Sequence, residues 1–351
     1  MQVAKKIFII LLLPLVLIGG TNYLLDPDYT LRRDYIPKLV EALSNGKMIS
    51  GPVNINSRLL KKYWIETLPG NPEVLVLGSS RTLGLSKEAF PGKTFFNASV
   101  SNCTFQDMYA FLNLFEKKQK PIMPQTIIIC ADQWLFGSSF SEKRWLNYRG
   151  DFVEMLQTTG DLSASQFPSK WVLQKEWIKE LFSVRYLVRS FRQRGKTETF
   201  EICNSIADNK MMFLPSGVRL LPKDVVNASE DEIKQRATDY FYSSGDEHFN
   251  KLSVLQCQLF EDFVNHLKAK KCEVILYIPP YHPETYRLMQ QSPKYKGVFK
   301  VDDYLLRVAK NYQLKVAGAT NPSKLNLSAA DFYDGVHLKP EVLEDVFKQN
   351  Q

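Results

Sequence analysis

The chain has 351 residues, of which 44% are hydrophobic and 23% charged, so its composition is that of a globular protein and excludes a disordered or fibrous one. Its length allows one large domain or one domain with an insertion. The formal net charge of +8 favours anionic partners such as lipid headgroups, acidic polymers or nucleic acid. Because no zinc-type Cys/His spacing, recognition-helix signature or RNP-like motif accompanies the charge, nucleic acid is not expected as a partner.

Residues 1–25 are predicted to be a membrane anchor. Lys5 and Lys6 precede a nearly continuous apolar stretch from Ile7 to about Leu25, near the lower limit of roughly 17 to 25 residues for a spanning helix. A cleaved signal peptide has a shorter apolar core and a small-residue cleavage site, which "LIGGTN" does not supply. A buried N-terminal helix would have to hide apolar residues on every side. We therefore expect an uncleaved, single-pass anchor with its N-terminus in the cytoplasm and the rest of the protein outside.

The remainder of the chain predicts an α/β domain. Residues 26–70 are mixed and charged and predict a helical linker. In residues 71–351, short apolar runs alternate with amphipathic segments, which is typical of a parallel sheet covered by helices on both faces. Strands are expected at 73–78, 94–99, 125–136 (apolar until Asp132), 273–280 and 314–318, and helices at 104–118, 253–270 and 301–311.

The alternation is interrupted by an aromatic and basic insertion at about 138–250. Within it, residues 170–196 predict a helix that either caps the domain or forms a surface that meets a membrane or an anionic polymer. The five cysteines show no paired spacing, so neither a disulfide framework nor a metal site is expected. No cofactor motif is present in the sequence, and none is expected.

Polar side chains gather where the predicted strands end. In open parallel sheets, sites form beyond the carboxyl ends of the strands. Ser80 follows the first strand, and a D-x-x-H pattern near the end of the chain supplies Asp334 and His337. A serine hydroxyl needs a neighbouring base, and a carboxylate orients that base, so the three residues predict acyl-transfer chemistry. The alternative is that Ser80 only ends a strand, while Asp334 forms a turn and His337 begins a helix.

The residues also resemble a known family. "LVLGSSRT" (75–82), "NASVSNCT" (97–104), "ADQW" (131–134) and "DGVH" (334–337) are similar to the four blocks of the SGNH/GDSL hydrolases. The resemblance implies a three-layer α/β/α fold with a flavodoxin-like sheet and a Ser80–His337–Asp334 triad. It also implies an oxyanion hole made by the backbone N–H groups of Ser80 and Asn102. Three positions depart from the family: Ser79 stands where aspartate is usual, Asn102 where glycine is usual, and Asp132 (or Gln133) where asparagine is usual.

The anchor, the "NYLLDP" segment that follows it and the Asp-x-Trp of the third block resemble a membrane-anchored subgroup of bacterial envelope proteins. That subgroup includes the accessory proteins of teichoic-acid D-alanylation and alginate O-acetylation, which work beside membrane-bound O-acyltransferases. The resemblance implies a serine O-acyltransferase or esterase outside the cytoplasm that acts on an envelope polymer or an acylated donor. The alternative is a non-catalytic SGNH-like scaffold that assists such a membrane enzyme.

Five further residues are expected to line the site: Ser79, Arg81, Asp132, Gln133 and His282. An ionised Asp132 would repel an oxyanion, so it is protonated, or Gln133 or Arg81 takes the donor role, or Asp132 has another function such as capping the next helix. Arg81 either clamps a substrate carboxylate or phosphate or pairs with a surface acid. His282, between prolines, is expected to shape the rim of the site.

Overall fold

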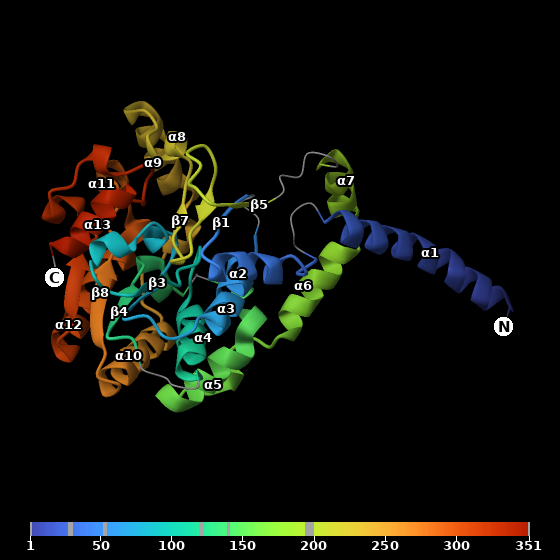
Figure 1. Ribbon diagram of the computed structural model, residues 1–351, viewed down its shortest axis with the longest axis horizontal. Helices are drawn as coiled ribbons and strands as arrows, with labels where there is room; N and C mark the ends of the chain where they lie inside the picture. The colour runs from blue at the N-terminus through green and yellow to red at the C-terminus, as the bar shows by residue number, and fades with distance from the viewer. Residues whose placement is uncertain are drawn as a thin grey trace.

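The computed structural model describes residues 2–26, 31–51, 55–118, 123–138, 141–193 and 200–349, with only the backbone described for residues 2–11 and 193. Helix α1 (Gln2–Leu25) spans the stretch predicted as an anchor and projects from the body of the molecule (Figure 1). Met1 and the side chains of residues 2–11, which belong to the predicted anchor, lie outside the described part. Among the residues that were described, no helix is long and apolar enough to cross a membrane.

The body contains the predicted parallel sheet. Every pair of neighbouring strands in this five-stranded sheet is parallel, which confirms the α/β class. Counted along the chain, its strands lie in the order 2-1-3-4-5, an order in which ligands bind beyond the carboxyl ends of the first and third strands. Across the sheet the strands are β3 (Phe95–Asn97), β2 (Val74–Leu77), β4 (Thr126–Cys130), β8 (Glu273–Ile278) and β9 (Lys315–Gly318).

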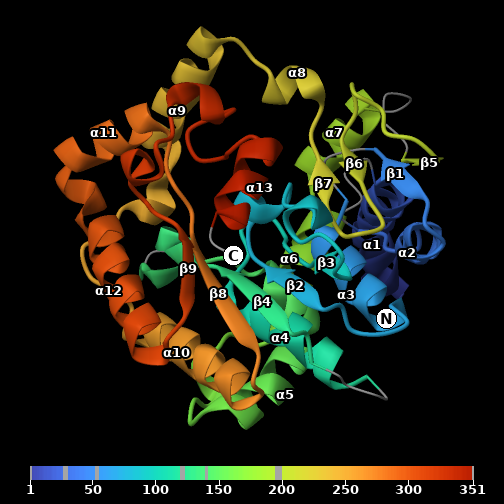
Figure 2. The ribbon, with the colours of Figure 1, turned by 60° about the vertical axis from the view of Figure 1, so that its left-hand side comes forward.

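Both faces of the sheet are buried, so its strands are apolar throughout instead of alternating with polar residues. On β2, Leu75 and Leu77 join a large core, whereas Val74 and Val76 join a smaller core on the opposite face. The result is a three-layer arrangement (Figure 2). The large core is filled by α2 (Ile36–Ser44), α3 (Ser57–Thr67), α4 (Phe105–Glu116), α10 (Val254–Ala269) and α12 (Lys296–Tyr312), and the smaller one by α13 (Pro340–Lys348).

A second, antiparallel sheet was not predicted. Its strands lie in the order β5 (Glu201–Cys203), β1 (Met48–Ser50), β6 (Met212–Phe213) and β7 (Arg219–Leu220). Strand β1 belongs to residues 26–70, and both helices of that segment pack in the large core. Residues 26–70 are therefore part of the domain, not a purely helical linker, because their apolar side chains recur at helical spacing and need burial. The insertion likewise contains three strands besides its helices.

The helices of the insertion divide into two groups. Helices α6 (Trp171–Leu181) and α7 (Val184–Gln193) lie at the base of α1 (Figure 1), and the helix predicted at 170–196 is broken between them at Phe182 and Ser183; residues 194–196 lie outside the described part. The other helices cover the body of the domain. They are α5 (Arg149–Thr159), α8 (Lys223–Val226) and α9 (Glu230–Ser243). Outside the insertion, α11 (Pro283–Gln291) follows β8.

Candidate active site

Ser80 lies in a tight turn at the carboxyl end of β2. The strand ends at Leu77, Ser79 is extended, and Ser80 begins a 3-10 turn that Ser79 caps by accepting a hydrogen bond from the Arg81 N–H (3.2 Å). Gly78 is required in this turn, because a Cβ at that position would overlap Thr82 Oγ1 and the Cβ of Cys130. A turn of this kind presents the Ser80 hydroxyl at the edge of the sheet.

The neighbouring strand holds this turn in place. The side-chain amide of Asn97, the last residue of β3, donates to the carbonyl oxygens of Thr82 (2.7 Å) and Leu85 (3.0 Å). The hydroxyls of Ser99 and Thr82 also lie 2.9 Å apart. The polar residues of the predicted second block therefore support the Ser80 turn from the adjacent strand.

His337 and Asp334 meet Ser80 in the order that the sequence predicted. The Nε2 atom of His337 lies 2.8 Å from Ser80 Oγ, and its Nδ1 atom lies 2.7 Å from Asp334 Oδ2. Asp334 also accepts hydrogen bonds from the backbone N–H groups of Val336 and His337, each 2.9 Å long. The ring of Tyr333 stacks on the imidazole with centroids 5.3 Å apart and planes 3° from parallel. These contacts fix both the position and the plane of the imidazole.

The hydrogen-bond partners of the His337 ring determine which of its nitrogens carries the hydrogen. Burial alone would raise the pKa of Asp334, but the adjacent His337 and the hydrogen bonds from His337 and the Val336 N–H hold that pKa below its ordinary value. Asp334 is therefore ionised at neutral pH and accepts a hydrogen bond from the Nδ1–H of His337. This arrangement leaves Nε2 free to accept the hydrogen of the Ser80 hydroxyl.

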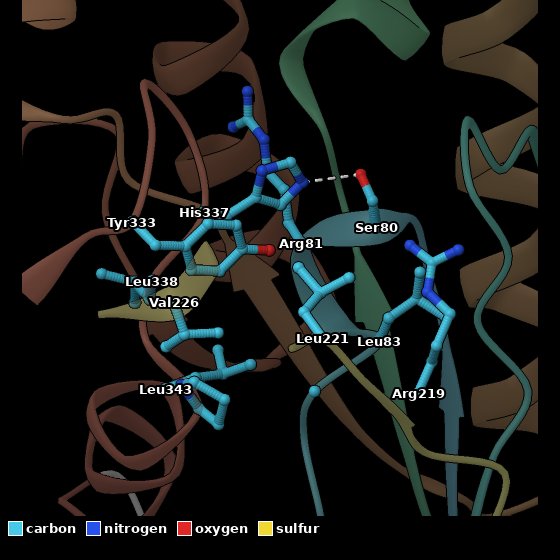
Figure 3. A pocket seen from close by; sticks show the side chains of 12 residues that line it. Ser80, Arg81, Leu83, Arg219, Leu221, Val226, Tyr333, His337, Leu338 and Leu343 are labelled. Carbon is cyan, nitrogen blue, oxygen red and sulfur yellow. Dashed lines mark hydrogen bonds between the residues drawn. The ribbon is translucent and has the colours of Figure 1, made fainter. Parts of the chain in front are cut away.

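Ser80 and His337 open into a small cavity of about 30 Å³ (Figure 3). Its other walls are mostly apolar. The insertion supplies part of them, together with the segments that follow β2 and precede α13. The apolar lining residues are Leu83, Leu221, Val226, Leu338 and Leu343.

Arg81 also lines this cavity, but its charge is directed into the protein. Its Nε atom lies 3.5 Å from Asp132 Oδ1, its Nη2 atom lies 3.3 Å from Glu247 Oε1, and the side chain is 3% exposed. The guanidinium is enclosed between the rings of Trp134 and Tyr281, 4.7 and 4.4 Å from their centroids. Arg81 thus pairs with buried acids, so neither the predicted substrate clamp nor the predicted surface pair describes it.

The two third-block residues belong to the same buried network. Burial raises the pKa of Asp132 to about 6, although Arg81 and hydrogen bonds from Ser79 and Cys130 oppose that rise. Asp132 makes no helix-capping hydrogen bond; it contacts Arg81 and the Cys130 thiol instead. The Gln133 amide donates to Pro279 O (3.1 Å) and Thr320 Oγ1 (2.6 Å), while its oxygen accepts from Arg81 (3.1 Å). The Gln133 amide therefore has both of its protons engaged.

Asn102 is not among the residues that line the cavity. It is exposed in a left-handed turn (φ 51°), and its carbonyl oxygen accepts a hydrogen bond of 2.7 Å from Arg58. Arg58 in turn pairs with Asp107 in the first turn of α4, which anchors this loop to the start of that helix. Of the two predicted oxyanion donors, only the Ser80 N–H lies at the cavity, and it has no hydrogen-bond partner in the described part of the chain.

His282 lies behind the loop that carries the triad. Its N–H donates to Gly335 O (3.0 Å), and its Nδ1 accepts from the Glu284 N–H (3.1 Å) at the start of α11. Burial lowers the pKa of His282, whose ring packs against Phe332. These contacts agree with the predicted role of His282 in shaping the loop beside the site.

Three residues at or behind the cavity were not predicted: Arg219, Tyr333 and Glu247. Two of them, Arg219 and Glu247, come from the insertion, which carries no motif. The signal that could have identified Tyr333 is its position directly before the D-x-x-H pattern, where a ring can stack on the histidine.

No protein-family model matches this chain, and no curated protein matches it.

Proposed function

We propose that the protein is an SGNH-type serine O-acyltransferase or esterase that acts on a cell-envelope polymer through Ser80, His337 and Asp334. The observation that carries the proposal is the chain of contacts from Ser80 Oγ to His337 Nε2 (2.8 Å) and from His337 Nδ1 to Asp334 (2.7 Å). The order of the strands in the parallel sheet is the flavodoxin-like order expected of such a fold. A non-catalytic scaffold would not need two segments 257 positions apart to bring an Asp–His pair onto one hydroxyl, so the catalytic function is favoured over the scaffold.

The reaction follows from these contacts. Ser80 Oγ attacks the carbonyl carbon of an acyl ester while its proton passes to His337 Nε2. The tetrahedral intermediate then expels the alcohol oxygen, which takes the proton from His337, and an acyl-Ser80 remains. A hydroxyl of the polymer or a water molecule next loses its proton to His337 and attacks the acyl carbon. Ser80 is released when it recovers that proton.

Asp334 and the Ser80 backbone assist at two points. The ionised carboxylate stabilises the imidazolium that forms after each proton transfer. The Ser80 N–H, which has no partner in the described part of the chain, is available to donate to the oxyanion. Arg219, Leu221 and Val226 of the insertion line the cavity, and exclusion of water by these residues would favour transfer to a polymer hydroxyl over hydrolysis.

Removal of the Ser80 hydroxyl tests the mechanism. We expect Ser80→Ala to lower the rate of release of p-nitrophenol from p-nitrophenyl acetate by roughly 10³-fold or more, because the nucleophile is lost. Ser243→Ala, which changes an exposed serine of α9, is the matched control and should retain full activity. Ester cleavage that persists in folded Ser80→Ala would contradict the mechanism.

We further propose that the protein is anchored by α1 in the cell membrane, with its body outside the cytoplasm and close to a membrane-bound O-acyltransferase that supplies acyl groups. The apolar stretch 7–25 supports this proposal. The base of α1 is also fastened to the insertion: the Asn22 amide donates to the carbonyls of Leu181 (2.9 Å) and Ser183 (3.0 Å). The Tyr186 hydroxyl donates to Asp26 (2.6 Å), so "NYLLDP" contains both attachment points.

Helix α7 has the surface of an interfacial helix. Its inner face, with Tyr186 and Ser190, is buried. Two exposed stripes at helical spacing lie on the remaining surface. The apolar stripe has Val184 (60% exposed), Val188 (44%) and Phe191 (54%), and the basic stripe has Arg185, Arg189 and Arg192. Adjacent apolar and basic stripes suit a helix lying on anionic lipid headgroups.

Depth-dependent quenching tests this placement. In proteoliposomes that contain brominated and anionic lipids, we expect Phe191→Trp to add quenchable fluorescence relative to the parent protein. Tyr242→Trp, at a residue of α9 that is 74% exposed, is the control and should add fluorescence that the lipids do not quench. Equal quenching at the two positions would contradict the proposed orientation.

A further inference from the structure

Arg219 is a residue of the insertion whose position allows it to contact a bound substrate. It begins β7, and its backbone N–H donates to the Leu83 carbonyl (2.9 Å), three residues beyond Ser80. Arg219 and Ser80 line the same cavity. Figure 3 shows its guanidinium on one side of Ser80 and His337 on the other. A group bound by Arg219 would therefore lie next to an ester held at Ser80.

A buried lysine fixes the turn that delivers Arg219. Lys61 is fully buried on α3, and its ammonium nitrogen bonds to the carbonyls of Asn97 and Gly217. The Asn97 N–H donates to the Ser216 carbonyl (2.8 Å) as well. Gly217 has φ +85°, and a Cβ there would overlap the backbone of Asn97. The turn between β6 and β7 is thus seated on the end of β3, and Arg219 extends from a rigid support.

Among the described residues, the charge of Arg219 has no acidic partner. Within the described residues, no carboxylate lies at ion-pair distance from it. Its Nη1 donates to Ser101 Oγ (3.3 Å), and its Nε is buried without a hydrogen-bond partner. Burial lowers the pKa of Arg219, which shows that its charged form is not compensated by the surrounding protein. A partly buried guanidinium with unused donors is costly unless a ligand pairs with it.

We infer that Arg219 binds an oxyanion of the substrate, a carboxylate or a phosphate, beside the ester that Ser80 attacks. This inference rests on the proposed acyl chemistry and narrows its substrate to an acidic polymer or acidic acyl donor. The planar guanidinium presents paired donors that match a carboxylate or phosphate. The rest of the cavity wall is mostly apolar, so Arg219 supplies the charged contact that selects the substrate.

Three matched esters test the inference. The substrates are the 3-O-acetyl derivatives of methyl glucoside, of methyl glucuronide and of methyl glucoside 6-phosphate, and the readout is released acetate. We expect the wild type to prefer one or both charged esters. Arg219→Ala should lower the ratio of kcat/KM for charged over neutral ester by about 10- to 100-fold, mainly through KM, because a hydrogen-bonded charge contact is lost. The two charged esters separate carboxylate from phosphate recognition.

Two variants serve as controls. Arg219→Lys keeps the positive charge and should retain part of the preference. Arg307→Ala removes an exposed arginine of α12 that contacts Tyr304, far from the cavity lining, and should leave the ratio unchanged. A ratio that is the same in wild type and folded Arg219→Ala would overturn the inference, because Arg219 would then have only a structural role.

If the wild type cleaves none of the esters, the proposed acyl chemistry is contradicted, and a binding measurement then tests the Arg219 site separately. Calorimetric titration of the full-length wild type and Arg219→Ala with the same three sugars then decides. Tighter binding of a charged sugar that is lost in Arg219→Ala supports the oxyanion site on its own. Equal affinity for charged and neutral sugars, or no binding, contradicts it.

Discussion

Arg81 and Arg219, the two arginines at the candidate site, differ in whether a carboxylate balances their positive charge. Arg81 lies between Asp132 and Glu247 and is enclosed by two aromatic rings, whereas Arg219 faces no carboxylate in the described part of the chain. Both line the cavity that contains Ser80. Arg81 therefore has a structural role at the site, because its charge is already paired with buried carboxylates when no ligand is bound. Arg219 retains the capacity to bind one.

The largest expected effect is on stability, and it separates the two arginines. We expect Arg81→Met to lower the free energy of unfolding by about 3–5 kcal/mol, because Asp132 and Glu247 would be buried without their cation. Arg219→Met should change it by less than about 1 kcal/mol, because no buried acid loses a partner. Urea unfolding followed by circular dichroism measures both values. Equal losses in the two variants would contradict the assignment of different roles.

A second effect concerns the pH dependence of the Arg81 network. Burial raises the pKa of Asp132 from 3.8 to about 6, and each pKa unit corresponds to about 1.4 kcal/mol. Because the folded-state pKa is the higher one, the stability from this group is fully present below pH 3.8 and is lost as the pH rises through about 6.

Asp132→Asn should remove this dependence. Between pH 4 and pH 7 we expect the unfolding free energy of the wild type to fall by about 2 kcal/mol more than that of the variant, as measured by urea titrations at several pH values. The comparison between the two proteins cancels the titration of other groups. Parallel pH profiles would show that Asp132 is not the titrating member of the network.

The smallest effect concerns the support of Arg219. Lys61→Met keeps the length of the side chain but leaves the carbonyls of Asn97 and Gly217 without their donor. We expect a loss of about 1–2 kcal/mol in unfolding free energy and a reduced preference for charged esters. A variant that loses stability but keeps the full preference would show that Lys61 does not position Arg219.

The residues of the site that lie near the carboxyl ends of the strands could be predicted from the sequence. Short apolar runs and the rule that sites lie at carboxyl ends were enough to bring Ser80 together with Asp334 and His337. The five strands of the main sheet were predicted near their observed bounds, except that β4 ends at Cys130 and not at Phe136. Local patterns determine these features.

Other features depend on contacts between distant segments and were not predicted. Strand β1 pairs with strands of the insertion more than 150 positions away. A strand of three residues is too short to produce a recognisable sequence pattern. The role of Arg81 required Glu247, which lies 166 positions away. Asn102 was assigned to the oxyanion hole by resemblance, whereas its contact with Arg58 holds it in a loop that does not line the cavity.

The most direct test of the central claim is the reaction of the full-length protein with a fluorophosphonate, followed by mass-spectrometric mapping of the modified residue. A serine activated by His337 reacts with such reagents, whereas an ordinary surface serine does not. We expect one modified residue, Ser80. Labelling should be abolished in Ser80→Ala and strongly slowed in His337→Ala. A folded protein that remains unlabelled, or that is labelled at another serine, would contradict it.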